Sequence, residues 1–206
     1  MHDGQDVSLG VQNLLLMSLL KEWRLEEPAV IAHDFGGATA LRAHYLNGAI
    51  YSRLILIDPV AVAPWGSPFV QHVRKHEEAF AGLPAYAHRG LLKAYLAGAA
   101  HAPLGTEAEE IYTKPWTGPD GQPAFYRQIA QMDQKYTDEI EPLYCPMPFP
   151  VSILWGSEDQ WIPLANGKRL AAKLTTGKLT IVQGAGHLVQ EDAPEAIVAA
   201  ALTSSH

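Results

Sequence analysis

The sequence predicts an α/β fold in which a mostly parallel sheet is interrupted by a helical cap. Apolar runs without polar alternation occur at 28–33 and 53–59, and further strand-like segments occur at 149–156 and 178–184. Strands buried on both faces have this composition, which favours a parallel sheet covered by helices on each side. From about 60 to 147, proline and glycine instead punctuate short helical segments, and no strand is apparent. A chain of 206 residues is long enough for one domain that carries such an insertion.

The expected elements of the first half alternate between helix and strand. A helix is predicted over about 8–23, where Asp6 or Ser8 can cap the N-terminus and leucines form a broad apolar face. After the first strand, a second helix is predicted over 37–47, with Gly48 suited to the left-handed conformation that closes it.

The alternation resumes after the insertion. Helices are predicted over about 163–174 and 192–202, after the third and fourth strands. We therefore expect the core domain to comprise residues 1–62 and 148–206, and the helical cap to comprise residues 63–147.

Composition excludes several classes of protein. The net charge is −7, and the 15 Lys and Arg residues are scattered, so no nucleic-acid partner is expected. The single cysteine, Cys145, excludes an internal disulfide framework and is compatible with a reducing compartment. The N-terminus lacks a signal-peptide pattern, and no apolar run approaches the ~20 residues that span a membrane. We therefore expect a soluble, cytoplasmic protein without a membrane partner.

Polar residues follow each predicted strand at its carboxyl end, where parallel α/β sheets bind their ligands. The four strands end in turn at Asp34, at Asp58, at Glu158 and Asp159, and at His187. We expect these side chains to converge on one site.

Asp34 occupies the central position of the sequence Ala-His-Asp-Phe-Gly at residues 32–36. Small residues two places on either side permit a tight strand-to-helix turn that lifts the central side chain clear of the sheet, as in a nucleophile elbow. The backbone N–H of Phe35 and the N-terminus of the following helix stabilise negative charge nearby. The residue usually found at this position is serine, so the aspartate is the informative difference.

An aspartate nucleophile implies a particular chemistry. Attack on an sp³ carbon displaces a halide or opens an epoxide, and it leaves an alkyl-enzyme ester that water must hydrolyse. His187 fits the base that activates this water, and Asp159 fits the acid that orients the histidine. Glu158 or Asp58 could serve as the acid instead.

Three segments, "VIAHDFGGATALRAHYL", "ILWGSEDQWIPLANGKRLAAKL" and "VQGAGHLVQEDAPEAI", together resemble the α/β-hydrolase fold family in its aspartate-nucleophile branch of epoxide hydrolases and haloalkane dehalogenases. The resemblance covers the chain from residue 6 onward. It implies a cofactor-independent hydrolase with Asp34 as nucleophile, Asp159 as its charge partner and His187 as base, acting on a small apolar molecule and water.

Within this branch, two residues favour an epoxide hydrolase over a dehalogenase. Many haloalkane dehalogenases carry tryptophan after the nucleophile to hold the halide, whereas Phe35 has no such donor. Epoxide hydrolases use cap tyrosines to protonate the opening ring, and "GQPAFYRQIAQM" resembles their N-W-Y-R motif, with Tyr126 at the tyrosine. Tyr86 and Tyr95 are both candidates for the second tyrosine.

No metal or organic cofactor is expected. His33 beside Asp34 could suggest a metal pair, but no further His and Asp residues at ligand spacing accompany it. Together with Phe35 and Tyr126, His33 is instead assigned to the oxyanion and substrate-binding side of the site.

The resemblance also reveals a difference at the front of the chain. Only 33 residues precede Asp34, and the H-G-x-P segment that supplies the second oxyanion donor is absent, so about a third of the usual catalytic domain is expected to be missing. The strand at 29–33 would then be an exposed edge, and we expect self-association through it. Either the start lies further upstream, or the chain is a non-catalytic scaffold that oligomerises.

Overall fold

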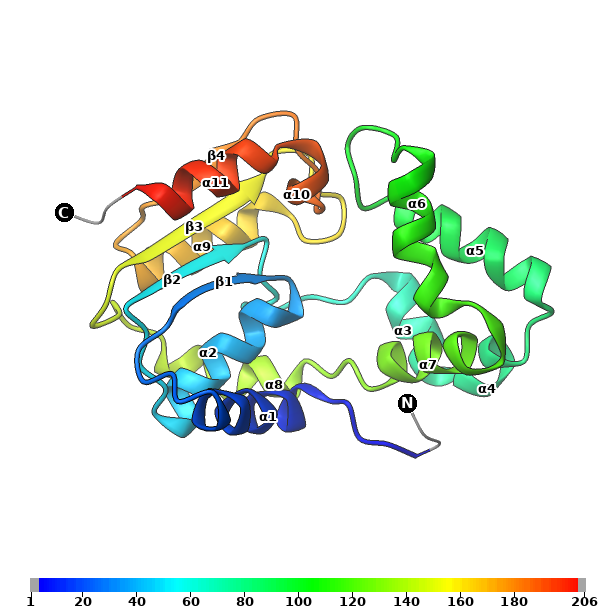
Figure 1. Ribbon diagram of the computed structural model, residues 1–206, viewed down its shortest axis with the longest axis horizontal. Coiled ribbons are helices and arrows are strands. Elements are labelled where there is room, and N and C mark those ends of the chain that lie inside the picture. The colour runs from blue at the N-terminus through cyan, green and yellow to red at the C-terminus, as the bar shows by residue number, and fades with distance from the viewer. Residues whose placement is uncertain (1–3, 204–206) are drawn as a thin grey trace.

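The computed structural model describes residues 4–203, and its centre is a four-stranded parallel sheet (Figure 1). The strands β1 (Ala29–His33), β2 (Arg53–Ile57), β3 (Val151–Gly156) and β4 (Thr180–Val182) lie side by side in chain order. Strands β1 and β2 pair in step along their length, so His33 lies opposite Ile57 and both strands end at the same level. The predicted fold class is confirmed.

Helices cover both faces of the two central strands, β2 and β3, which explains why these strand sequences lack polar alternation. On one face, Leu54, Leu56, Ile153 and Trp155 pack in a cluster with residues of α1, α2 and α9. On the other face, Ile55, Ile57, Leu154 and Val182 pack with residues of α10 and α11. The helices concerned are α1 (Leu9–Glu22), α2 (Phe35–Asn47), α9 (Leu164–Leu174), α10 (Val189–Asp192) and α11 (Pro194–Leu202).

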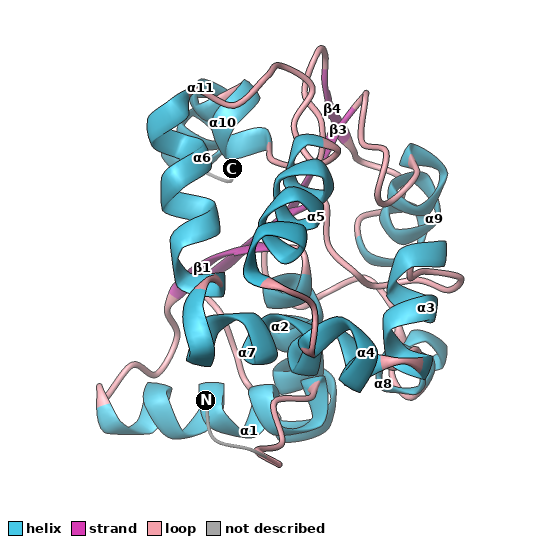
Figure 2. Cartoon of the chain, turned by 90° about the vertical axis from the view of Figure 1, so that its right-hand side faces the viewer, coloured by secondary structure: helices cyan, strands magenta, loops and turns pink. Residues whose placement is uncertain are grey.

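The insertion forms a separate group of helices in front of the carboxyl edge of the sheet (Figure 2). Its helices are α3 (Pro68–Lys75), α4 (Glu77–Ala81), α5 (Ala85–Ala97), α6 (Thr106–Thr113) and α7 (Gly118–Ala130), with a 3₁₀ turn, η1, at Lys114–Trp116. A small apolar cluster of its own, which includes Val73, Leu92 and Ile129, holds these helices together. No strand occurs between 63 and 147, all of which is described.

The end of the insertion returns to the core. Helix α8 (Lys135–Asp138) and the 3₁₀ turn η2 (Glu141–Leu143) lie beside α1 and α2, away from the other inserted helices (Figure 1). Ile140, between them, is fully buried in the main core cluster. This segment therefore packs with the core, although it falls within the range 63–147 predicted as cap.

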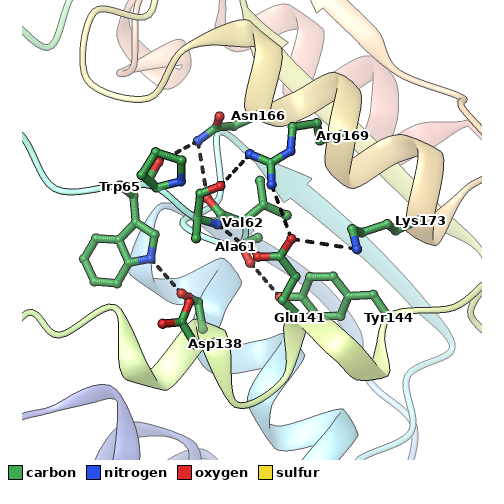
Figure 3. Close-up of polar contacts among 12 residues, drawn as sticks. Ala61, Val62, Trp65, Asp138, Glu141, Tyr144, Asn166, Arg169 and Lys173 are labelled. Atoms are coloured by element: carbon green, nitrogen blue, oxygen red, sulfur yellow. Dashed lines mark hydrogen bonds and ion pairs between the residues drawn. The ribbon is translucent and has the colours of Figure 1, made fainter.

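Polar contacts fasten the two crossings between core and cap to helix α9 (Figure 3). The Glu141 carboxylate accepts from the backbone N–H of Ala63 at 3.0 Å and forms ion pairs with Arg169 at 3.4 Å and Lys173 at 3.7 Å. The Tyr144 hydroxyl donates to the Ala61 carbonyl at 2.9 Å. Since both crossings are held in this way, the cap has a defined position over the sheet.

Element boundaries differ from the predictions mainly at the ends of the chain. Ser8 precedes α1, but its hydroxyl makes no capping bond, whereas the Asp6 carboxylate accepts from the Ser8 N–H. Gly48 closes α2 with φ 73°, as predicted. The last helix, predicted over about 192–202, is confirmed as α11; the short helix α10 precedes it and ends before Pro194, because the proline has no N–H to continue α10. No helix in the described range 4–203 has the length and apolarity needed to cross a bilayer.

Candidate active site

The turn between β1 and α2 consists of one residue, Asp34. Its backbone has φ 50° and ψ −120°, a conformation that costs an ordinary residue on the order of 1–3 kcal/mol. Hydrogen bonds compensate for this strain, since the Asp34 N–H donates to Ile57 and the Asp34 carbonyl accepts from Gly37 and Val60. A side chain at Gly37 would collide with Pro59, which explains why a small residue follows the elbow. The turn raises the Asp34 carboxylate above the end of the sheet.

Loops after β3 and β4 bring an acid and a histidine to the same place. The Asp159 carboxylate accepts from the backbone N–H of Trp161 at 2.7 Å and of Ile162 at 2.9 Å, and its other oxygen lies 2.9 Å from His187 Nδ1. His187 Nδ1 therefore carries the proton. His187 Nε2 faces Asp34 Oδ1 at 3.7 Å and has no hydrogen-bond partner within residues 4–203. The three residues predicted as a triad are thus adjacent, in the order acid, histidine, nucleophile.

The charges around His187 favour its protonated form. Burial lowers the pKa of His187, but the hydrogen bond with Asp159 and the negative charges of Asp34 and Asp159 outweigh burial, so the pKa lies above the usual value. The imidazolium that would form during general-base catalysis is therefore stabilised in this position.

Asp159 is the acid best placed among the three that the sequence offered. Glu158 is exposed, and its carboxylate accepts from the Ser157 hydroxyl next to it at 3.1 Å. Asp58 is fully buried at the end of β2, where one carboxyl oxygen accepts from Gly156 N–H at 2.9 Å and the other has no hydrogen-bond partner in the described chain. Burial, reinforced by the charge of Asp159, raises the pKa of Asp58 to about 8, so Asp58 is neutral at pH 7.

His33 contacts the histidine loop. Its Nε2 lies 2.8 Å from the His187 carbonyl oxygen, so this nitrogen is the donor. Burial and the neighbouring His187 lower the pKa of His33. His33, Asp58 and His187 are the one group in residues 4–203 whose ligand atoms, all within 4.8 Å of each other, could reach a common metal ion. One ring nitrogen of each histidine is already engaged by the hydrogen bonds described above.

Two cavities meet at Asp34 and Phe35, which line both. The first, of about 180 Å³, is lined by aromatic and aliphatic side chains from the cap and from the Asp159 loop, including Trp65, Tyr95, Trp116, Phe125 and Trp161. The second, of about 470 Å³, is more polar, and its wall includes Ser8, Gln12, His33 and Gln131. Asp34 is therefore reachable from an apolar cavity.

The structure corrects the expectation for the cap tyrosines. Tyr126 lines neither cavity; it is fully buried, and its hydroxyl lies 2.8 Å from His88 Nδ1. Tyr86 is 82% exposed on the cap surface. Tyr95 lines the apolar cavity and stacks on Trp161, which in turn lies against the His187 ring.

The helical periodicity of α7 indicates which of its residues face the apolar cavity, and the resemblance to the N-W-Y-R motif did not. The cavity wall is formed by Phe125, Gln128, Ile129 and Met132, which share one side of α7 and its end. Tyr126 lies one position away from this stripe, and its side chain therefore points into the cap.

Comparison with known proteins places these observations in a family. Residues 5–201 match the family described as "Alpha/beta hydrolase family". A crystal structure of an alpha/beta hydrolase fold protein from Burkholderia ambifaria is 58% identical and superposes with a TM-score of 0.95, covering 97% of this chain and 74% of that one.

Two further relatives are less similar in sequence. The uncharacterized hydrolase YugF of Bacillus subtilis (strain 168) is 26% identical over 198 residues, which are 90% of this chain and 68% of YugF. The putative carbamate hydrolase RutD of Caulobacter sp. (strain K31) is 26% identical over 196 residues, which are 91% of this chain and 68% of RutD.

Proposed function

The chain belongs to the alpha/beta hydrolase family, and we propose that it hydrolyses small apolar epoxides through an alkyl-enzyme ester on Asp34. One observation carries the proposal: an aspartate occupies the elbow, with His187 Nε2 3.7 Å from its carboxylate and an apolar cavity on its other side. A serine hydrolase would have a hydroxyl at this position.

In the first step, an Asp34 carboxylate oxygen attacks one epoxide carbon, and the bond from that carbon to the ring oxygen breaks. The ring oxygen takes the proton of the Tyr95 hydroxyl, which lines the same cavity. Burial and the Asp34 charge raise the pKa of Tyr95, so the hydroxyl is protonated before the reaction. The products of this step are a hydroxyalkyl ester on Asp34 and a tyrosinate.

In the second step, His187 Nε2 removes a proton from water as the water oxygen attacks the carboxyl carbon of the Asp34 ester. The Phe35 N–H, in the first turn of α2 where backbone donors have no partner within the helix, is placed to stabilise the oxyanion that forms. Collapse breaks the bond between the carboxyl carbon and the alkyl oxygen. The leaving alkyl oxygen takes the proton of the hydroxyl group that water added, so a diol is released and the carboxylate is restored, and the proton on His187 returns to the Tyr95 tyrosinate.

The proposal is tested by trapping the ester. A His187→Gln variant incubated with styrene oxide should gain the mass of one epoxide, and peptide mapping should place the adduct on Asp34. Asp34→Asn in the same background should gain nothing. Folded His187→Gln protein that forms no adduct would refute the role of Asp34 as nucleophile.

A haloalkane dehalogenase is the alternative within the same chemistry. Two tryptophans, Trp116 and Trp161, line the apolar cavity, and an indole N–H could hold a departing halide where Phe35 cannot. Halide release from 1-bromobutane, measured alongside diol formation from styrene oxide, distinguishes the two activities.

A non-catalytic scaffold is the alternative outside catalysis. Strand β1 lies at the edge of the described sheet, and Ile31 on it is 52% exposed, a combination that favours pairing with a second chain. Sedimentation velocity should then show a dimer or larger species, and a monodisperse monomer would contradict this proposal. The cytoplasmic location and the absence of a nucleic-acid partner stay predictions from composition.

A further inference from the structure

Helix α10 follows directly after His187, and its last residue, Asp192, binds two separate loops. One Asp192 carboxylate oxygen accepts from Gly186 N–H at 2.8 Å and from His101 N–H at 2.8 Å. The other oxygen accepts from Ala102 N–H at 2.9 Å. Gly186 precedes His187, whereas His101 and Ala102 belong to the cap, so a single carboxylate joins the two parts of the chain.

The cap loop at 99–102 lies in direct contact with the histidine loop. The Leu188 N–H donates to the Ala99 carbonyl at 2.9 Å, which is the third hydrogen bond, after those of His101 and Ala102 to Asp192, between this loop and residues 186–192. A Cβ at Gly186 would lie 2.7 Å from the His101 nitrogen and 2.8 Å from the Ala99 oxygen, so there is no room for a side chain. In Figure 1 the loop after α5 accordingly faces α10 across the boundary between cap and core.

The cap loop is also the continuation of the helix that carries Tyr95. Helix α5 ends at Ala97, and Tyr95 in its last turn stacks on Trp161 with ring centroids 4.4 Å apart. Trp161 lies 5.0 Å from the His187 ring. The Asp192 carboxylate therefore fixes the backbone on both sides of a short chain of rings, Tyr95, Trp161 and His187.

We infer that Asp192 is a positioning residue that sets the position of the cap tyrosine, Tyr95, relative to the core histidine, His187. The inference rests on the proposed function, because these two residues exchange protons in its two steps. Asp192 touches neither substrate nor reacting atoms. A carboxylate suits the task because it accepts from three backbone N–H groups at once, which an amide with one acceptor oxygen cannot do.

Asp192→Asn is the variant that tests the inference, because it keeps the shape of the side chain and removes one acceptor oxygen. Glu191→Gln is the matched control: Glu191 is exposed, lies on the same helix and accepts from the hydroxyl of Tyr112, on cap helix α6, at 2.8 Å, a bond that the glutamine oxygen can keep. Single-turnover experiments with styrene oxide measure ester formation and ester hydrolysis separately.

We expect Asp192→Asn to slow both steps by roughly ten- to hundredfold, since a displacement of about 1 Å can have this effect, while KM changes less than threefold. Glu191→Gln should stay within threefold of the wild type in both steps. A second measurement does not need turnover: the Nδ1 proton of His187, held by Asp159, should give a downfield NMR resonance that shifts or broadens in Asp192→Asn alone.

Three results would overturn the inference. They are unchanged rates in folded Asp192→Asn, a loss confined to KM, or an equal loss in Glu191→Gln. If Asp192→Asn does not fold, Asp192→Glu keeps the charge one methylene further out and should slow the same two steps to a smaller extent. If the wild type forms no ester, the proposed function fails. The positioning role would then be refuted separately if the Nδ1 proton resonance of His187 were the same in Asp192→Asn as in the wild type.

Discussion

Asp58 should make the stability of this protein fall as pH rises, and Asp58→Asn should remove the effect. The side chain is fully buried, and its only hydrogen bond in the described chain is to Gly156 N–H, which an asparagine oxygen can also accept. The pKa of Asp58 is about 8 in the folded protein, raised first by burial and then by the Asp159 charge. In the unfolded chain it is about 3.9.

The sign of the effect follows from proton counting. Between about pH 4 and pH 8 the folded state holds the Asp58 proton and the unfolded state does not, so stability decreases with pH in this window. One proton corresponds to about 1.4 kcal/mol per pH unit. From pH 5.5 to 7.5, the free energy of unfolding of the wild type should therefore drop by about 3 kcal/mol relative to that of Asp58→Asn.

Urea unfolding of both proteins at five pH values across this window measures the difference. Asp120→Asn, at an exposed carboxyl group, is the matched control and should follow the wild-type pH dependence. Parallel curves for wild type and Asp58→Asn would refute the reasoning, because they would mean that Asp58 is ionised in both states or in neither.

Three further predictions concern the cap and the core. Tyr95→Phe should slow ester formation by about 10²–10⁴, whereas Tyr126→Phe should leave it within a few-fold; the reverse order in single-turnover assays would restore the motif-based assignment. Gly37→Ala should lower the free energy of unfolding by about 1–3 kcal/mol, because its Cβ would collide with the proline after β2. Gly36→Ala, which has open space around it, should not lower the free energy of unfolding, and urea titrations of both variants check this. Arg42→Leu should cost about 2–3 kcal/mol in the same assay, because the buried guanidinium donates to groups on α1 and α8; a change below 0.5 kcal/mol would contradict that role.

Local sequence patterns determined much of the fold and the elbow. Apolar runs of strand length mark β1, β2 and β3. Burial on both faces accounts for the runs of β2 and β3, whereas β1 is equally apolar although its Ile31 is exposed. A strand-to-helix change between small residues indicates the elbow around Asp34 locally, although the collision that keeps Gly37 small is with Pro59 after β2, and Gly36 has open space around it. The order of Asp34, Asp159 and His187 along the chain follows from the order of the strands.

Several contacts of the site residues are made between segments far apart in the sequence, so no local pattern could predict them. Three acids followed strand ends, but only the packing of the loops brings Asp159 to His187 Nδ1 and leaves Asp58 buried against Gly156. The motif that resembles N-W-Y-R indicated Tyr126 as the tyrosine of the site. The orientation of α7 within the cap instead directs the Tyr126 hydroxyl to His88.

By itself, then, the sequence determined a parallel α/β sheet with a helical insertion and an aspartate at its elbow, because hydrophobic periodicity and turn sterics act over a few residues. Only the tertiary structure decided which tyrosine reaches the apolar cavity and that Asp192 ties the cap to the histidine loop. The physical reason is that side-chain direction and backbone hydrogen bonds between loops some 90 residues apart are set by how whole helices pack.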